Sequence, residues 1–188
     1  MRKTILAVLT LALAAGLQAQ LPVPRQATEL TITQADGTRT LLSSYKGKVV
    51  VVQFLFTSCP HCQRLSQELT RLAPEFKGQV QMIGVAFDSA DAVKVRDYVK
   101  YIDVGFPVGY SDRNAVMTYL GLNDMIQRIG VPQVVVIDRQ GVVREQSEAL
   151  GGGQLGNPAY LKPLLTKLVN EPAGAVASAR AQPDGTKH

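Results

Sequence analysis

Apolar residues along the middle of the chain follow two periods, which predict alternating strands and helices. Residues 49–56 are too continuously apolar for a sheet with one face in water, so they predict a central strand covered on both faces. After Pro60, apolar side chains recur at steps of three and four residues, which predicts a helix that Pro74 kinks or ends. This buried stripe consists of Cys62, Leu65, Leu69, Leu72 and Phe76.

The same periods continue on both sides of this strand and helix. Residues 28–33 alternate as an edge strand does, and a turn at Asp36-Gly37 before renewed structure at 40–45 predicts an N-terminal hairpin. The pattern next predicts a strand at 80–87, a helix carrying Ala92, Val95, Val99 and Ile102, and a short extended stretch at 106–109. It then predicts a helix that is capped by Asp112 and carries Val116, Tyr119 and Leu120. A hairpin of 134–137 with 142–145 follows. The last predicted element is a helix at 161–169, which starts irregularly because of Pro163.

This order of elements indicates an α/β domain with a mixed central sheet flanked by helices. Ligand sites in such sheets lie at the carboxyl ends of the strands. The residues that follow the predicted central strand are therefore the first place to look for chemistry.

The two ends of the chain differ in composition from its middle. Residues 1–19 have a basic start, an apolar stretch and small residues before a plausible cleavage point, which predicts a signal peptide. The apolar stretch is shorter than the roughly 20 residues that span a bilayer, so an uncleaved N-terminal membrane anchor is the weaker alternative. We expect residues 20–170 to form one periplasmic or secreted domain and residues 171–188 to form a disordered tail.

The charge of the chain argues against one class of partner. The formal net charge is +5, and removal of Arg2 and Lys3 with the signal peptide leaves +3. This charge is mild and dispersed, so no nucleic-acid partner is expected.

The candidate chemistry lies in the two cysteines of the chain, Cys59 and Cys62. If a helix starts after Cys59, Pro60 lies in its first turn and Cys59 becomes the cap residue. Unpaired backbone N–H groups and the positive end of the helix dipole then favour the thiolate form of Cys59. Cys62 lies one turn further on the same face, within reach of a disulfide. This is the arrangement that thiol–disulfide exchange requires.

Two alternatives for this pair are weaker. A zinc site needs four ligands, and the histidines of the chain are His61, between the cysteines, and His188, the last residue. We therefore expect no metal. A static disulfide is conceivable in an exported protein, but a bridge across one helical turn stabilises little.

The segment at 49–62, Val-Val-Val-Val-Gln-Phe-Leu-Phe-Thr-Ser-Cys-Pro-His-Cys, resembles the active-site strand and helix of the thioredoxin superfamily. Val131-Pro132, just before a predicted strand, resembles that superfamily's cis-proline. The segments at 46–50, 92–108 and 137–141 further resemble its exported, AhpC/TSA-related TlpA/ResA-like branch. The resemblance covers residues 28–169 and implies a thioredoxin-like three-layer sandwich with a strand–helix insertion. It also implies a protein thiol–disulfide oxidoreductase.

The resemblance implies roles for individual residues. Cys59 would be the nucleophile and Cys62 the resolving thiol, with no cofactor beyond this redox pair. Pro132, if cis, would stand over the disulfide, and the Val131 backbone would pair with an extended substrate segment.

Two departures from the family concern the surroundings of Cys59. There is no tryptophan, and Ser58 stands where many relatives place one. Gln53 stands in the place of thioredoxin's buried carboxylate, so proton transfer must use another group. Asp88 and Asp91 lie near the position of an acidic residue in ResA-like proteins and are candidates for a proton relay, although Asp91 can equally cap a helix.

A third departure concerns the direction of the reaction. The pair Pro60-His61 between the cysteines resembles that of DsbA-like oxidases, whereas the rest of the chain resembles a branch of reductases. A histidine here can stabilise the Cys59 thiolate and so make the disulfide a stronger oxidant. The sequence leaves the direction open.

Two other functions occur on the same fold. Sco-like copper proteins space their cysteines one residue further apart and add a distant histidine. Thiol peroxidases of the peroxiredoxin type need a threonine three residues before the attacking cysteine, where this chain has Phe56. The expected partners are instead cysteine-containing exported proteins and a membrane redox partner, and the expected state is a monomer.

Overall fold

One eight-stranded mixed sheet runs through the computed structural model, which describes residues 21–122, 129–151 and 153–172. The strand order is β1-β8-β7-β4-β5-β6-β2-β3. The pairs β4–β5 and β5–β6 are parallel, and the other neighbouring pairs are antiparallel. The strands are β1 (Arg25–Gln26), β2 (Thr31–Gln34), β3 (Arg39–Leu41), β4 (Val49–Leu55), β5 (Val80–Ala86), β6 (Val108–Tyr110), β7 (Gln133–Ile137) and β8 (Val142–Gln146).

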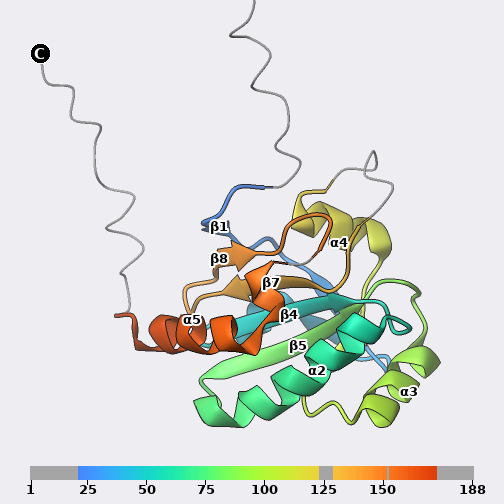
Figure 1. The fold of residues 1–188 in the computed structure, drawn as a ribbon. Helices are drawn as coiled ribbons and strands as arrows, with labels where there is room; N and C mark the ends of the chain where they lie inside the picture. Colours follow the sequence, from blue (N-terminus) through green and yellow to red (C-terminus); the bar gives the residue numbers. More distant parts are fainter. Residues whose placement is uncertain (1–20, 123–128, 152, 173–188) are drawn as a thin grey trace, which may run out of the picture.

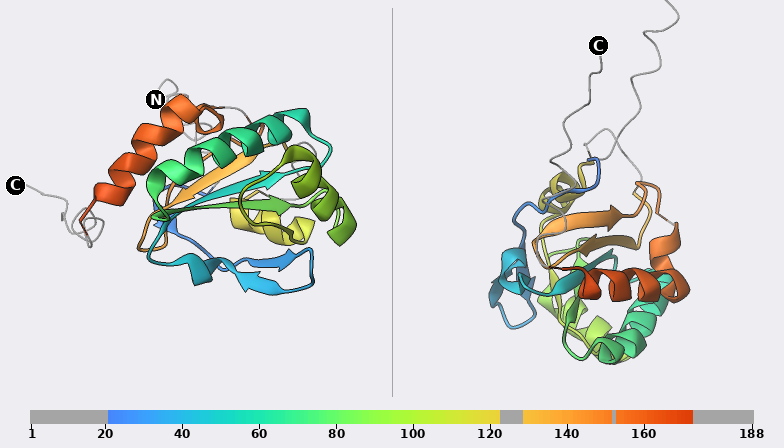
Figure 2. Two further views of the ribbon diagram at one scale, coloured as in Figure 1. Left: turned by 90° about the horizontal axis from the view of Figure 1, so that it is seen from below. Right: turned by 90° about the vertical axis from the view of Figure 1, so that its left-hand side faces the viewer.

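Helices cover the sheet on both faces and make three layers (Figures 1 and 2). The α-helices are α2 (Pro60–Leu72), α3 (Ala92–Ile102), α4 (Arg113–Leu120) and α5 (Pro158–Asn170). Helices α2, α3 and α5 contribute to one apolar cluster, while α4 and the N-terminal hairpin contribute to the other. The three-layer α/β fold expected from the sequence is therefore present.

The central strand β4 contributes side chains to both apolar clusters. Its successive side chains point to opposite faces of the sheet, so Val51 and Leu55 join the α2 side while Val52 and Phe54 join the α4 side. All seven residues of β4 are buried. The prediction of a central strand covered on both faces is confirmed.

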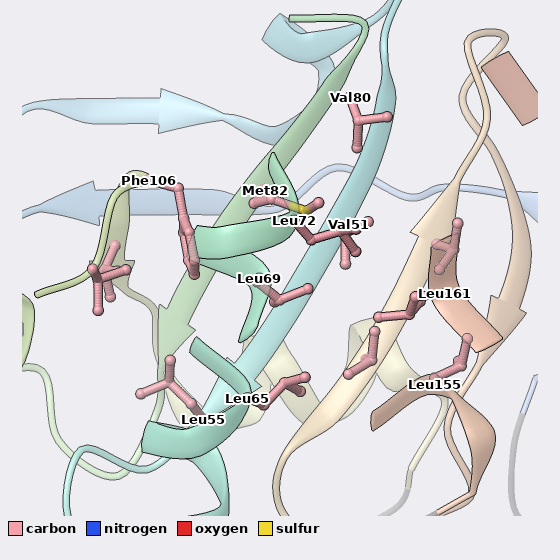
Figure 3. Packing of buried hydrophobic residues seen from close by; sticks show 14 of the residues in the cluster. Val51, Leu55, Leu65, Leu69, Leu72, Val80, Met82, Phe106, Leu155 and Leu161 are labelled. Atoms are coloured by element: carbon pink, nitrogen blue, oxygen red, sulfur yellow. The ribbon is translucent and has the colours of Figure 1, made fainter. Parts of the chain in front are cut away.

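Helix α2 buries the stripe that the sequence predicts. Leu65, Leu69 and Leu72 pack in the same cluster as Val51 and Leu55 (Figure 3). The α-helix ends at Leu72, and a single 3₁₀ turn, Ala73–Phe76, continues to β5. This end agrees with the expected effect of Pro74.

Two sequence expectations about strand and helix positions are wrong. The stretch at 28–33 does not supply an edge strand, because β2 lies between β3 and β6. Gly109 of β6 permits this pairing, since a Cβ there would lie 2.6 Å from the carbonyl oxygen of Thr33. The last helix does not start irregularly near residue 161. It begins at Pro158, Asn157 caps it, and Pro163 lies inside it, where it removes one backbone hydrogen bond.

The folded part of the chain extends beyond the expected domain end. The carboxylate of Glu171, which the sequence analysis assigns to the tail, binds Arg144 at 2.6 Å and 3.2 Å. The predicted signal peptide and residues 173–188 of the predicted tail lie outside the described residues. None of the helices in the described ranges combines the length and apolarity needed to cross a bilayer.

Candidate active site

Cys59 lies where the central strand passes into α2. Its backbone N–H donates to the carbonyl of Phe56 at 3.1 Å, which closes a tight turn after β4. Cys59 has extended backbone angles and caps α2, and Pro60 takes the first turn, where no N–H is needed. The Cys59 Sγ accepts a hydrogen bond from the Cys62 N–H at 3.3 Å. This donor and the helix terminus stabilise negative charge on the sulfur.

Cys62 lies one turn further along α2 in different surroundings. Both cysteines are free thiols, but Cys59 is partly exposed whereas Cys62 is fully buried. Burial raises the pKa of the Cys62 thiol, and its hydrogen bond with Cys59 raises it further. The pair therefore combines an accessible sulfur with a protected one, as attack and resolution require.

Val131 and Pro132 lie against the accessible sulfur. The peptide bond between them is cis. The thiol of Cys59 donates to the carbonyl oxygen of Val131 at 3.8 Å. The loop is held from below by the buried Gln133, whose Nε2 donates to the carbonyls of Gly130 and Glu148, both at 2.7 Å.

A groove of about 630 Å³ opens beside the cysteines, between α2 and the start of α5. Its lining combines apolar and charged side chains with the cis-peptide loop: His61, Arg64, Leu65, Glu68, Val131, Pro132, Gly156, Asn157 and Pro158. Glu68 is paired with Arg71 at 3.0 Å. Pro60 and His61 are exposed, and the His61 ring makes no hydrogen bond within the described ranges.

The two candidate relay acids have different positions. Asp88 holds the active-site turn, because its Oδ2 accepts hydrogen bonds from the Thr57 N–H at 3.1 Å and the Thr57 hydroxyl at 2.8 Å. Its charge also contributes to raising the pKa of Cys62. Asp91 instead caps α3 by accepting from the N–H groups of Val93 and Lys94. The structure therefore brings Asp88 to the site, whereas Asp91 stabilises a helix.

Two residues near Cys62 were missed by the sequence analysis. Ser66 and Tyr98 form a buried hydrogen-bond chain with Gln53, and Gln53 Nε2 donates to the Cys62 carbonyl at 2.8 Å. Helical spacing alone offered a signal, because Tyr98 follows Val95 by three residues and so lies on the buried face of α3.

The described residues contain no group of three or more His, Cys, Asp and Glu side chains that could hold a metal ion. The Cys59 sulfur has the carbonyl of Val131 and the N–H group of Cys62 as hydrogen-bond partners, and the Asp88 carboxylate holds the turn before it through Thr57.

Several known proteins are similar to this chain in sequence. Residues 23–146 match the AhpC/TSA family. The thiol-disulfide oxidoreductase ResA of Bacillus thuringiensis is 26% identical over 128 residues, which cover 68% of this chain and 70% of ResA. The thiol:disulfide interchange protein DsbE of Pseudomonas aeruginosa is 27% identical over 149 residues, which cover 79% of this chain and 77% of DsbE.

The fold is also shared with solved structures. The thioredoxin domain of a thiol-disulfide oxidoreductase from Bacteroides vulgatus superposes with a TM-score of 0.63 at 20% identity, over 80% of this chain and 99% of that domain. The three-layer sandwich is thus thioredoxin-like.

Proposed function

The chain belongs to the AhpC/TSA family as a TlpA/ResA-like protein of the thioredoxin superfamily, and on this basis we propose that Cys59 and Cys62 exchange disulfides with cysteines of exported proteins. Its reaction class is thiol–disulfide oxidoreduction. One observation carries the roles of the two residues: a partly exposed sulfur caps α2, and a buried sulfur follows one turn later.

The reaction proceeds in two exchanges. The Cys59 thiolate attacks one sulfur of a target disulfide, a bond forms between them, and the other target sulfur leaves as a thiolate. Cys62 then loses its proton and attacks Cys59 Sγ, so that the mixed disulfide breaks and the second target sulfur leaves. The target gains two electrons and the protein becomes the Cys59–Cys62 disulfide. The reverse sequence oxidises a target dithiol.

The target chain is proposed to lie along Val131 and Pro132. Its reactive sulfur must approach Cys59, whose thiol already faces the Val131 carbonyl at 3.8 Å. An extended segment there can pair with the Val131 backbone, while its flanking residues enter the groove along α2. His61 and Arg64 line that groove, so they face the target as well.

Asp88 is the proposed acceptor of the Cys62 proton. Its carboxylate lies at the active-site turn through Thr57, and it acts electrostatically on Cys62. A nearby carboxylate can take a proton either directly or through one water molecule.

Export, a membrane redox partner and a monomeric state remain part of this proposal. The composition of residues 1–19 and the resemblance to exported proteins support export. The reduction potential of the Cys59–Cys62 pair decides whether the protein donates or removes disulfides.

The peroxidase and copper functions are not favoured by the site. The residue in the peroxidase's threonine position is Phe56, whose ring packs on Phe87 at 4.7 Å and offers no hydroxyl to Cys59. A copper site of the Sco type would need a further histidine, and His61 is the one histidine within the described ranges.

Trapping the mixed disulfide tests the proposed function. Reduced Cys62→Ser protein, mixed with a peptide that contains one disulfide, should accumulate a covalent adduct at Cys59 by mass spectrometry. Cys59→Ser should form none, and the wild type should release reduced peptide. Absence of the adduct together with an inert wild-type pair would overturn the proposal.

A further inference from the structure

A chain of buried polar side chains from three elements lies beneath Cys62. Gln53 comes from β4, Ser66 from α2 and Tyr98 from α3. Their exposed fractions are 0%, 0% and 4%. Ser66 Oγ lies 2.8 Å from Gln53 Oε1 and 2.7 Å from the Tyr98 hydroxyl. This hydrogen-bond chain thus links helix α3 to the helical turn that carries the resolving thiol.

The direction of every hydrogen bond in this chain follows from its chemistry. The carboxamide of Gln53 donates from Nε2 to the Cys62 carbonyl and can only accept at Oε1. The single hydroxyl proton of Ser66 is therefore used on Gln53. Tyr98 must then donate to Ser66. Each link fixes the orientation of the next, so Tyr98 orients the carboxamide that holds Cys62.

This chain contains no carboxylate or amine. Its one titratable member is Tyr98, and burial raises the pKa of that phenol. The other ionisable groups that act on it are Cys59 and Cys62, while Cys59 and Asp88 act on Cys62. The hydrogen-bonded side chains of Gln53, Ser66 and Tyr98 therefore stay neutral over the working pH range and cannot take the Cys62 proton.

Burial of three polar side chains has a cost that apolar residues of similar size would avoid. The cost is offset here because every link is short and satisfied, and such networks order the groups that they join. The surroundings of Gln53 are otherwise apolar, with Val51 and Leu55 on the same face of β4. The polar side chains thus stabilise the position of the Cys62 backbone in surroundings that are otherwise apolar.

We propose that Tyr98, Ser66 and Gln53 are positioning residues that hold Cys62 for resolution of the mixed disulfide without acting as its base. This inference rests on the proposed thiol–disulfide exchange. It assigns α3 a role in the second exchange, although α3 contributes no residue to the groove.

The first test separates attack from resolution in Tyr98→Phe. Attack is measured as mixed-disulfide formation with a disulfide peptide in the Cys62→Ala background, and resolution as peptide release with Cys62 present. Loss of the Tyr98 hydroxyl should slow resolution about three- to tenfold, the range set by one hydrogen bond, and leave attack unchanged. Tyr101→Phe is the matched control, because Tyr101 lies on the same helix and is 89% exposed.

The second test removes the carboxamide from the hydrogen-bond chain. Gln53→Met keeps a side chain of similar length but offers no donor to the Cys62 carbonyl. Resolution should slow about three- to tenfold while attack stays unchanged. Gln81→Met, at a partly exposed position of β5, is the matched control.

The outcomes distinguish the two proposals. If the wild type does not exchange disulfides with the peptide, the proposed function fails and this inference fails with it. If the wild type exchanges normally but Tyr98→Phe alters attack and resolution equally, or neither, the positioning role is wrong. Should Tyr98→Phe not fold, Ser66→Ala breaks the same hydrogen-bond chain at its middle. It should likewise slow resolution and leave attack unchanged.

Discussion

The sulfur of Cys59 and the carbonyl oxygen of Val131 lie 3.8 Å apart, although 72 residues separate the two in sequence. They meet because β4 and β7 are antiparallel neighbours, with Phe54 opposite Gln133 near the carboxyl end of β4. The turn after one strand and the loop before the other therefore lie at the same edge of the sheet. A target sulfur bound to Cys59 must pass next to Val131.

The position of Val131 depends on a close backbone approach at Gly130. A Cβ atom at Gly130 would overlap the carbonyl group of Leu150, which is backbone and cannot rotate away. Gly130→Ala should therefore displace the loop at Gly130 or the loop at Leu150. The free energy of unfolding should fall by about 2–3 kcal/mol, which lowers Tm by roughly 5–10 °C. Thermal unfolding followed by circular dichroism measures this change.

Gly156→Ala is the stability control for that variant. A Cβ atom at Gly156 meets no atom within 4 Å. Its effect should stay within about 0.5 kcal/mol. Equal Tm values for the two alanine variants would contradict the assigned contact between Gly130 and Leu150.

The buried thiol of Cys62 predicts a pH dependence of the reduced protein's stability. Its folded pKa is raised, so above the unfolded value of about 8.5 the unfolded chain loses the proton that the folded chain keeps. This stabilising contribution is fully present below about pH 8 and declines as pH rises, by up to about 1.4 kcal/mol per pH unit. Urea unfolding of the reduced protein between pH 7 and about pH 9.5 measures the slope.

Comparison with Cys62→Ala isolates this contribution, since that variant keeps Cys59 and every other titrating group. The reduced wild type should lose stability relative to Cys62→Ala as pH rises. A difference that stays constant with pH would show that Cys62 titrates alike in the folded and unfolded states.

Replacement of Asp88 distinguishes a proton acceptor from a fixed charge. Asp88→Asn retains an acceptor for Thr57 but cannot take a proton. As the acceptor, Asp88 makes resolution by Cys62 faster, so the variant should resolve at least about tenfold more slowly at pH 7. As a mere negative charge it raises the pKa of Cys62, so the variant would instead resolve faster.

Stopped-flow release of the target peptide measures this step. Asp112→Asn is the matched control, because Asp112 caps α4 and asparagine caps a helix equally well. A faster Asp88→Asn variant would remove Asp88 from the mechanism as a proton acceptor.

His61 is expected to set the reduction potential. Its side chain is exposed two residues after Cys59, where an imidazole can stabilise the Cys59 thiolate and thus the reduced form. His61→Val should make the reduction potential more negative by at least about 30 mV. A shift of about 30 mV corresponds to about 1.4 kcal/mol for a two-electron couple. Equilibration of the Cys59–Cys62 pair in glutathione buffers measures it.

Lys100→Gln, an exposed change on α3, controls for loss of a remote positive charge. A wild-type potential near the roughly −120 mV of DsbA would indicate disulfide donation, and one near the roughly −270 mV of thioredoxin would indicate reduction of targets. No difference between His61→Val and the wild type would exclude His61 as the determinant.

Local pattern was enough to predict most of the elements. The apolar run of β4, the helical stripe after Pro60 and the cap at Asp112 each depend on residues a few positions apart, so they can be read directly from sequence. The same holds for the Cys59 cap and for the placing of Cys62 one turn later. These features determined the fold class and the reaction class.

Other features depended on which distant segments pack together. The interior place of β2 follows from the missing side chain at Gly109. The early start of α5 was a local signal that the sequence analysis missed, because Asn157 caps the helix and Pro158 begins it. Asp88 and Asp91 are three residues apart, yet one reaches the active-site turn and the other caps a helix. Periodicity says which face a residue occupies and not which partner it meets there.

By itself, the sequence determined a central strand, a helix that begins at a cysteine, and a second cysteine on its buried face. The family resemblance already suggested that Val131 and Pro132 lie near Cys59. The contact of the Val131 carbonyl with Cys59 Sγ and the joining of Tyr98 and Ser66 to Gln53 beneath Cys62 are given by the tertiary structure alone. The reason is physical. Backbone propensity and capping act over a few residues, whereas a hydrogen bond between three buried elements exists only once the sheet and both helices have packed.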